Sequence, residues 1–166
     1  MEFWDVFNKK GNKTGKMVKR GESLEKGEYH LVIFAWIKNR DGKFLISKRN
    51  PNKAGGNTWE TVGGSAISGE DSIDAVLREV KEELGINLNA KDGIHLKRLR
   101  YDTEAPWLSD IWSFNYDIDI SDVHFQQEEV CDVKWATKEE VLNLIAKGEF
   151  FKGDMHLKNI FENNLI

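Results

Sequence analysis

The segment from Gly64 to Ile86 limits the fold more than any other part of the chain, because it predicts one amphipathic helix. Apolar residues recur along it at steps of three, four and seven, which gives a helix a single buried face. These residues are Ile73, Val76, Leu77, Val80 and Leu84. Asp71 is suited to cap the helix N-terminus, with Asp74 favourable to the dipole there. Gly85 supplies the left-handed residue that ends a helix.

Three glutamates share another face of this predicted helix. Glu79, Glu82 and Glu83 are spaced i, i+3 and i+4, so their carboxylates crowd together. Each like-charged pair destabilises a helix by about 0.2–0.5 kcal/mol. A divalent cation reverses the sign of that effect, because hard cations such as Mg²⁺ prefer oxygen ligands. The alternative interpretation is a solvated acidic surface, which explains most charge runs on helices.

Residues at fixed offsets around the glutamates favour a metal site. Gly63 and Gly64 allow the backbone to run close to a ligand and to turn a carbonyl toward it. Arg78 cannot lose its proton, so it can hold a carboxylate through a bidentate pair. The whole set fills every fixed position of the Nudix box: Gly64, Glu70, Arg78, Glu79, Val80, Glu82, Glu83, Gly85 and Ile86. A chance match in a chain of this length has a probability of roughly 10⁻⁷ or less. The chain therefore resembles the Nudix hydrolases.

The resemblance implies a fold, a cofactor and a set of metal ligands. The fold is an α/β/α sandwich in which a mixed β-sheet lies between helices. The cofactor is Mg²⁺, with Mn²⁺ as the alternative ion. Glu79 and Glu83 are then the principal ligands and Glu82 supports them. Gly64, with its neighbour Gly63, adds a backbone carbonyl.

Further roles follow from the same resemblance. Arg78 orients the carboxylates, and Glu70 acts through water or by ordering its loop. Nudix enzymes take their general base from the box helix or from a downstream loop, so the base is either Glu79 or one of Glu128 and Glu129. Glu129 is preferred of the last two because it lies nearer a predicted strand. An acidic surface turn is the alternative reading of both.

The predicted activity is cleavage of a diphosphate linkage in a nucleoside diphosphate derivative, or a similar compound, by attack of water on phosphorus. Arg49 and Lys53 lie beside the presumed entrance and are candidates to bind a phosphate. Trp59, Trp107 and Trp112 are candidates to stack on a base. The alternatives are a solvated basic loop for Lys53 and core packing for the tryptophans. The substrate stays open, because this fold handles many diphosphates.

Composition predicts a soluble, cytoplasmic protein of one domain over residues 1–166. The chain is 40% hydrophobic and 31% charged, as in an ordinary globular domain. A net charge of −4 argues against an extended nucleic-acid-binding surface. The single Cys131 excludes an internal disulfide, and the N-terminal residues lack the pattern of a signal peptide. The longest apolar run, Leu31–Ile37, is far too short to span a bilayer.

Within this domain we expect an N-terminal hairpin extension at 1–28, a Nudix core at 29–147 and a C-terminal helix at 148–166. Periodicity and turn residues predict strands at 3–7, 17–20, 29–37, 43–48, 59–62, 94–101, 112–118 and 130–135. Thr137 and Glu140 form a capping box that opens a helix through Lys147. Asp154 is suited to cap the last helix. The segment Tyr101–Leu108 is expected to be a loop of the kind that sets specificity.

The N-terminal half also resembles the Nudix branch around isopentenyl-diphosphate isomerase. The resemblance rests on Trp4-Asp5-Val6, Gly15, Arg20-Gly21 and Glu28-Tyr29-His30, followed by Arg49 and Lys53. That isomerase needs a cysteine just before its degenerate Nudix region, and the stretch Asn57–Gly64 contains none. Cys131 is predicted to be a small buried apolar residue in a strand. Isomerase is therefore the weaker enzyme hypothesis, and a Nudix binding module without turnover is the non-enzyme alternative. The N-terminal strands could also pair across a homodimer.

Overall fold

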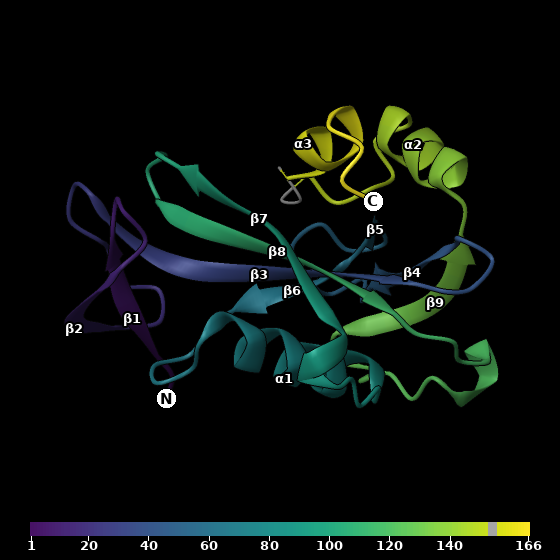
Figure 1. The fold of residues 1–166 in the computed structure, drawn as a ribbon, viewed down its shortest axis with the longest axis horizontal. Helices are drawn as coiled ribbons and strands as arrows, with labels where there is room; N and C mark the ends of the chain where they lie inside the picture. Colours follow the sequence, from purple (N-terminus) through teal and green to yellow (C-terminus); the bar gives the residue numbers. More distant parts are fainter. Residues whose placement is uncertain (153–155) are drawn as a thin grey trace.

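The computed structural model describes residues 1–152 and 156–166, and in this part of the chain helices cover both faces of one mixed sheet. Figure 1 shows α1 below the sheet and α2 and α3 above it. The strands are β1 Phe3–Asn8, β2 Lys13–Lys19, β3 Glu28–Lys38, β4 Phe44–Arg49, β5 Trp59–Glu60, β6 Val62–Ser65, β7 Gly93–Tyr101, β8 Trp107–Asn115 and β9 Val130–Ala136. The helices are α1 Ser72–Leu84, α2 Lys138–Ala146 and α3 Leu157–Glu162, with short 3₁₀ turns at Ala90–Asp92 and Ile120–Asp122. The predicted sandwich is confirmed.

The long strand β3 organises the sheet. It runs parallel to β8, from His30 opposite Trp107 to Lys38 opposite Asn115, and antiparallel to β6. The β4 strand pairs with β9 and β5, and β7 extends the sheet beyond β8. Parallel and antiparallel neighbours on one strand make the sheet mixed, as the sequence predicts.

Side chains of β3 alternate between two hydrophobic cores, as the period of two in a strand requires. Leu31, Ile33 and Ala35 belong to the core that includes the buried residues of α1. Trp36 points to the other side and is fully buried with residues of α2 and α3. Trp36 is therefore a core residue.

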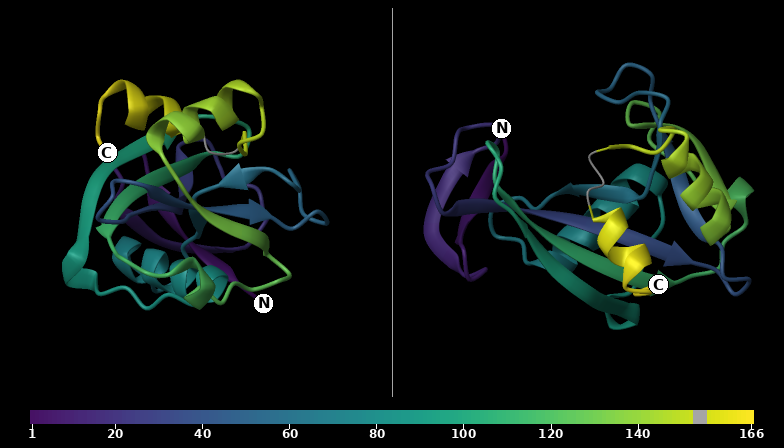
Figure 2. Two further views of the ribbon diagram at one scale, coloured as in Figure 1. Left: turned by 90° about the vertical axis from the view of Figure 1, so that its right-hand side faces the viewer. Right: turned by 90° about the horizontal axis from the view of Figure 1, so that it is seen from above.

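The N-terminal extension is an antiparallel β1–β2 hairpin at the opposite end of the molecule from α2 (Figure 2). It continues the sheet, because Phe7 and Asn8 of β1 pair with the start of β3. Side chains also join the hairpin to the loop before α1. Asp5 accepts hydrogen bonds from Ser68 Oγ at 2.7 Å and from the Gly69 backbone N–H at 3.1 Å. The hairpin is thus attached to the same loop that leads into the Nudix helix.

The expected strand at 112–118 is misplaced. The strand β8 begins at Trp107, and Tyr116 and Ile118 lie beyond its end. The residues from Leu108 to Ile111 are all buried, because both faces of this part of β8 are covered. A strand covered on both faces loses the alternation by which strands are found in a sequence. The expected loop over Tyr101–Leu108 correspondingly shrinks to residues 102–106.

Two further expectations need correction, and one lies outside the described residues. The predicted strand over 59–62 is divided into β5 and β6 at Thr61. Cys131 lies in β9 as predicted, but it is exposed rather than buried. Its thiol donates to the backbone carbonyl of Arg49 at 3.4 Å. The capping role expected of Asp154 falls on a residue that the structure does not describe. No helix in the described part of the chain is long and apolar enough to cross a membrane.

Candidate active site

The helix α1 begins and ends at the residues predicted from the sequence. Asp71 accepts hydrogen bonds from the backbone N–H groups of Ile73 and Asp74, each at 3.1 Å, and Asp74 completes a capping box. Gly85 ends the helix with φ = 69°, a left-handed conformation that glycine adopts without strain. Because the buried residues of α1 pack against those of β3, the acidic face of the helix has a defined rotation relative to the sheet.

Arg78 connects the residues of the motif. Its Nε and Nη2 atoms donate to the two oxygens of Glu70 at 2.6 and 3.1 Å. Its Nη1 donates to Glu79 at 2.9 Å and to Glu82 at 3.0 Å. Glu70 in turn accepts the Ile67 backbone N–H at 3.0 Å. One guanidinium therefore ties two carboxylates of α1 to the loop that precedes the helix.

Gly64 is required by the position of Glu79. A Cβ atom added to Gly64 would collide with the Glu79 carboxylate, which rests against the β6 backbone. At Gly63 an added Cβ would lie 2.7 Å from the Phe34 ring and 3.1 Å from the Ile33 carbonyl oxygen. The two glycines thus let a carboxylate on one side and an aromatic ring on the other approach the same stretch of backbone.

Glu83 has different surroundings from Glu79 and Glu82. It is 8% exposed, and its Oε2 atom is buried without a hydrogen-bond partner among the described residues. Burial, with the charges of Glu60 and Glu79, raises the pKa of Glu83 to about 8. Burial also raises the pKa of Glu79, although Arg78 opposes the rise. A partly buried carboxylate cluster with an unpartnered oxygen is electrostatically suited to a cation.

The three glutamates of α1 do not form a ready-made metal site. In the described part of the chain, no three Asp, Glu, His or Cys side chains are arranged around a common point as metal ligands. Glu79 and Glu82 are drawn to Arg78, whereas Glu83 lies in the buried acidic cluster. The oxygen-rich donor set, the unpartnered Glu83 oxygen and the close approach of the Glu79 carboxylate to the Gly64 backbone nonetheless fit a hard divalent cation.

Glu60 is a site residue that the sequence analysis did not single out. It is 7% exposed in β5, and its carboxylate accepts a 2.5 Å hydrogen bond from Arg49. Burial raises the pKa of Glu60, and the charge of Arg49 opposes that rise. The available signal was a charged residue inside a short predicted strand, because such residues are rarely buried unless paired.

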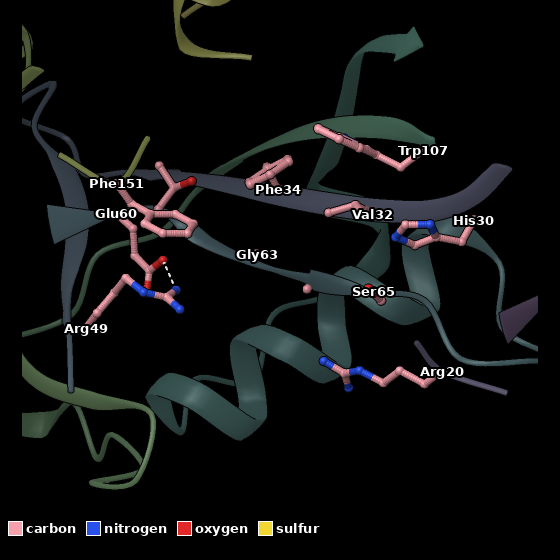
Figure 3. Close-up of a pocket in the computed structure, with 12 residues that line it drawn as sticks. Arg20, His30, Val32, Phe34, Arg49, Glu60, Gly63, Ser65, Trp107 and Phe151 are labelled. Atoms are coloured by element: carbon pink, nitrogen blue, oxygen red, sulfur yellow. Dashed lines mark hydrogen bonds and ion pairs between the residues drawn. The ribbon is translucent and has the colours of Figure 1, made fainter. Parts of the chain in front are cut away.

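Two cavities adjoin at this place. The first, of about 250 Å³, is lined by Glu79, Glu82, Glu83, Arg78, Lys53 and Glu129 among others, and we call it the acidic cavity. The second, of about 270 Å³, is lined by His30, Phe34, Arg49, Glu60, Trp107 and Phe151 among others, and we call it the aromatic cavity (Figure 3). Both cavities are also lined by Arg20, Gly63 and Gly64. The glycine backbone is therefore their common wall.

Of the two downstream candidates for the general base, one lines a cavity and the other does not. Glu129 lines the acidic cavity, where it forms an ion pair with Lys53, another predicted site residue. Glu128 is exposed and lines neither cavity. Arg49 lines the aromatic cavity, with its guanidinium 4.2 Å from the centre of the Phe151 ring.

The three candidate tryptophans differ in position. Trp107 lines the aromatic cavity and stacks on Tyr101 with ring centres 4.7 Å apart. Trp59 lines neither cavity, and Lys134 lies 4.3 Å from the centre of its ring. Trp112 donates a 2.8 Å hydrogen bond to Ser72 at the start of α1. Of the three, only Trp107 is placed to contact a ligand in these cavities.

Comparisons with known proteins identify the family. The NUDIX domain family model matches residues 28–157. An uncharacterised Nudix hydrolase of Listeria monocytogenes is 43% identical over 152 residues, which are 90% of this chain and 88% of that protein. An isopentenyl-diphosphate Δ-isomerase of Escherichia coli matches over only 92 residues, 54% of this chain and 50% of that one, with 29% identity.

Solved structures share the fold. A crystal structure from Deinococcus radiodurans has a TM-score of 0.76 and 26% identity, and the match covers 93% of this chain and 94% of that one. The Nudix domain of Shewanella oneidensis NrtR, solved with ADP ribose, has a TM-score of 0.64 and 18% identity over 83% of this chain and 89% of that one. The family model, the extended relatives and the intact motif agree, and the chain therefore belongs to the Nudix hydrolase family.

Proposed function

We propose that this protein is a Mg²⁺-dependent hydrolase of a diphosphate linkage in a nucleoside diphosphate derivative or a related small molecule. The observation that carries the proposal is the shared wall of the two cavities. On one side of Gly63 and Gly64 lie the carboxylates of α1, and on the other lie aromatic and guanidinium groups. A diphosphate can lie across this wall while the organic part of the substrate occupies the aromatic cavity.

The metal would be held by Glu79 and Glu83, with Glu82 and the carbonyl of Gly64 as further oxygen donors. A bound Mg²⁺ or Mn²⁺ would supply positive charge against the phosphoryl oxygens and activate the attacking water. Arg78 supports this set by fixing the directions of Glu79 and Glu82 through the hydrogen bonds of its guanidinium. Glu70 supports it indirectly, because it holds Arg78 against the loop before α1.

Glu129 is the general base in this proposal. It faces the acidic cavity from outside the Nudix helix, so it can take a proton from water without first leaving a metal ligand position. The Lys53 ammonium beside it pairs with the carboxylate and restricts its orientation. Glu128 has no such position, since its side chain is exposed outside the cavity.

The test is a panel of diphosphate compounds, including nucleoside diphosphates, nucleoside triphosphates, nucleotide sugars and ADP-ribose, incubated with Mg²⁺ or Mn²⁺. Products are identified by mass, and ¹⁸O-labelled water shows which phosphoryl group is attacked. We expect one class of compound to be cleaved at the diphosphate with a single ¹⁸O in the products. If no compound is hydrolysed with either metal, the protein is a binding module rather than a hydrolase.

The partial match to an isomerase keeps a second activity open to test. The structure adds an argument against it, because the thiol of Cys131 is exposed on β9 and lines neither cavity. We expect isopentenyl diphosphate and Mg²⁺ to give no dimethylallyl diphosphate. Formation of that isomer at an enzymatic rate, in the unaltered protein and in Cys131→Ala, would show that isomerisation is the correct chemistry.

A further inference from the structure

Arg20 lies outside the part of the chain that the family model matches, yet it lines both cavities. It follows the last residue of β2, in the N-terminal extension. In the described part of the chain, Gly63 and Gly64 are the other two residues that line both cavities. In Figure 3 its side chain enters below Ser65, on the opposite side of the aromatic cavity from Trp107.

The position of Arg20 is fixed by the fold of the extension. Its backbone N–H donates to the Glu2 carbonyl at 3.0 Å, which closes the end of the β1–β2 hairpin. The hairpin is joined to β3 by strand pairing and to the loop before α1 through Asp5. The backbone at Arg20 is thus held between two elements of the catalytic core.

The guanidinium of Arg20 is more exposed than those of Arg49 and Arg78, and its ion pair lies at the surface. Its side chain is 56% exposed, compared with 13% for Arg49 and 23% for Arg78. Arg49 is paired with the buried Glu60, and Arg78 with three glutamates. Arg20 pairs with Glu2 at 2.5 Å, and Glu2 is itself 50% exposed. Because such surface pairs contribute only about 0–1 kcal/mol, Arg20 can exchange Glu2 for a stronger partner at little cost.

We propose that Arg20 binds the diphosphate of the substrate at the junction of the two cavities, exchanging Glu2 for phosphate oxygens. A guanidinium donates two parallel hydrogen bonds to phosphate oxygens, and a diphosphate carries more negative charge than the single exposed carboxylate that it would replace. The inference rests on the proposed function and extends it, because it places the diphosphate over Gly63 and Gly64. It also gives the N-terminal extension a role in substrate binding.

The test uses the full chain and measures binding of inorganic pyrophosphate by calorimetry at a fixed excess of Mg²⁺. We expect Arg20→Ala to weaken binding roughly 10- to 100-fold, which is the usual effect of losing a hydrogen bond to a charged group. The affinity of Arg20→Lys should fall between those of the unaltered protein and Arg20→Ala, since lysine keeps the positive charge but not the planar pair of N–H donors. Glu2→Gln should bind as tightly as the unaltered protein or more tightly. Thermal melting checks that each variant is folded.

Arg40→Ala is the matched control, because Arg40 also forms a surface ion pair, with Asp117, but lines neither cavity. It should bind pyrophosphate within about twofold of the unaltered protein, the effect of a remote surface charge. The inference is overturned if Arg20→Ala binds normally, if Arg40→Ala loses as much, or if the unaltered protein does not bind pyrophosphate.

Turnover separates this inference from the proposed function. With the best substrate of the panel, Arg20→Ala should raise KM with little change in kcat, because its contact is the same before and during reaction. A fall in kcat with an unchanged KM would contradict a binding role. If no compound is hydrolysed but pyrophosphate binding still depends on Arg20, the hydrolase proposal fails and the binding site stands.

Discussion

At the scale of single residues, Glu79 and Glu83 lie on one face of α1 but have different surroundings. Glu79 rests on the Gly64 backbone and is held by Arg78, so its direction is set before any ligand arrives. Glu83 lies deeper, beside Glu60, with an oxygen that no described side chain satisfies. An ordered carboxylate next to an unsatisfied one is a combination that a cation stabilises and that an apolar ligand does not.

Glu79→Gln and Glu83→Gln should each abolish activity and leave the fold intact. The amide keeps the shape of the side chain but removes the negative charge that holds a divalent ion. Without metal, Glu83→Gln should be slightly more stable than the unaltered protein, because it removes a buried carboxyl near Glu60. The measurements are kcat at saturating Mg²⁺ and urea unfolding, with the exposed Glu139→Gln as control. Retention of more than about a tenth of kcat by both variants, a barrier change below ~1.4 kcal/mol, would contradict the assignment.

Glu129→Gln should lower kcat by roughly 10²–10⁴, the usual contribution of a general base. Mg²⁺ affinity should change less than in Glu83→Gln, because a base contacts the water rather than the ion. Glu128→Gln is the matched control, since its neighbouring carboxylate is exposed outside the cavity. The check is kcat as a function of pH, with Mg²⁺ binding measured separately. Near-normal rates with an unchanged acidic limb in Glu129→Gln would move the role to Glu79 or to the metal.

At the scale of elements, α1 could be predicted almost to the residue and β8 could not. The helix is encoded locally, by a capping residue, an apolar stripe and a terminal glycine, all within a few turns. The strand β8 is buried on both faces, and only its pairing with β3 shows where it begins. Cys131 was misjudged for a related reason, because the exposed face of β9 depends on which strands cover it. Sequence patterns predict local structure well, but they do not show which distant segments will cover a given strand.

Asp71→Ala should destabilise the protein by about 1 kcal/mol, within a usual range of 0.5–2 kcal/mol for a lost N-cap. The side chain of Asp71 satisfies two backbone N–H groups at the start of α1, and alanine leaves them without this partner. Urea unfolding of the metal-free protein measures the change. Asp41→Ala, in the exposed turn after β3, should have a much smaller effect. Equal losses in the two variants would mean that the cap contributes nothing specific.

At the scale of the whole molecule, the site depends on parts of the chain that are far apart in sequence. The resemblance predicts the layers and the acidic helix, but not that the N-terminal hairpin reaches the cavities. That arrangement depends on contacts such as Asp5 with Ser68, 63 residues apart, and on Arg20 beside Gly64. Glu60 and Arg49 form their pair across neighbouring strands. Such long-range contacts arise from packing and leave no periodic trace in the sequence.

The upper helical layer contains a buried histidine that should make folding sensitive to pH. His156 precedes α3 and is 1% exposed. Its Nε2 atom accepts a hydrogen bond from the Trp36 indole at 3.3 Å, and its ring lies 4.0 Å from that of Phe34. Burial lowers the pKa of His156 from 6.5 to about 3. The folded protein therefore keeps this imidazole neutral where the unfolded chain would bind a proton.

The sign of the effect follows from linkage. Above about pH 6.5 His156 is neutral in both states, and as the pH falls toward 3 only the unfolded chain takes up the proton, so stability is lost. The slope is about 1.4 kcal/mol per pH unit for one proton. His156→Gln should reduce the slope of the unfolding free energy between pH 5 and 6 by about this amount, relative to the unaltered protein. Urea unfolding at several pH values measures both slopes, and equal slopes would mean that His156 is protonated in the folded protein.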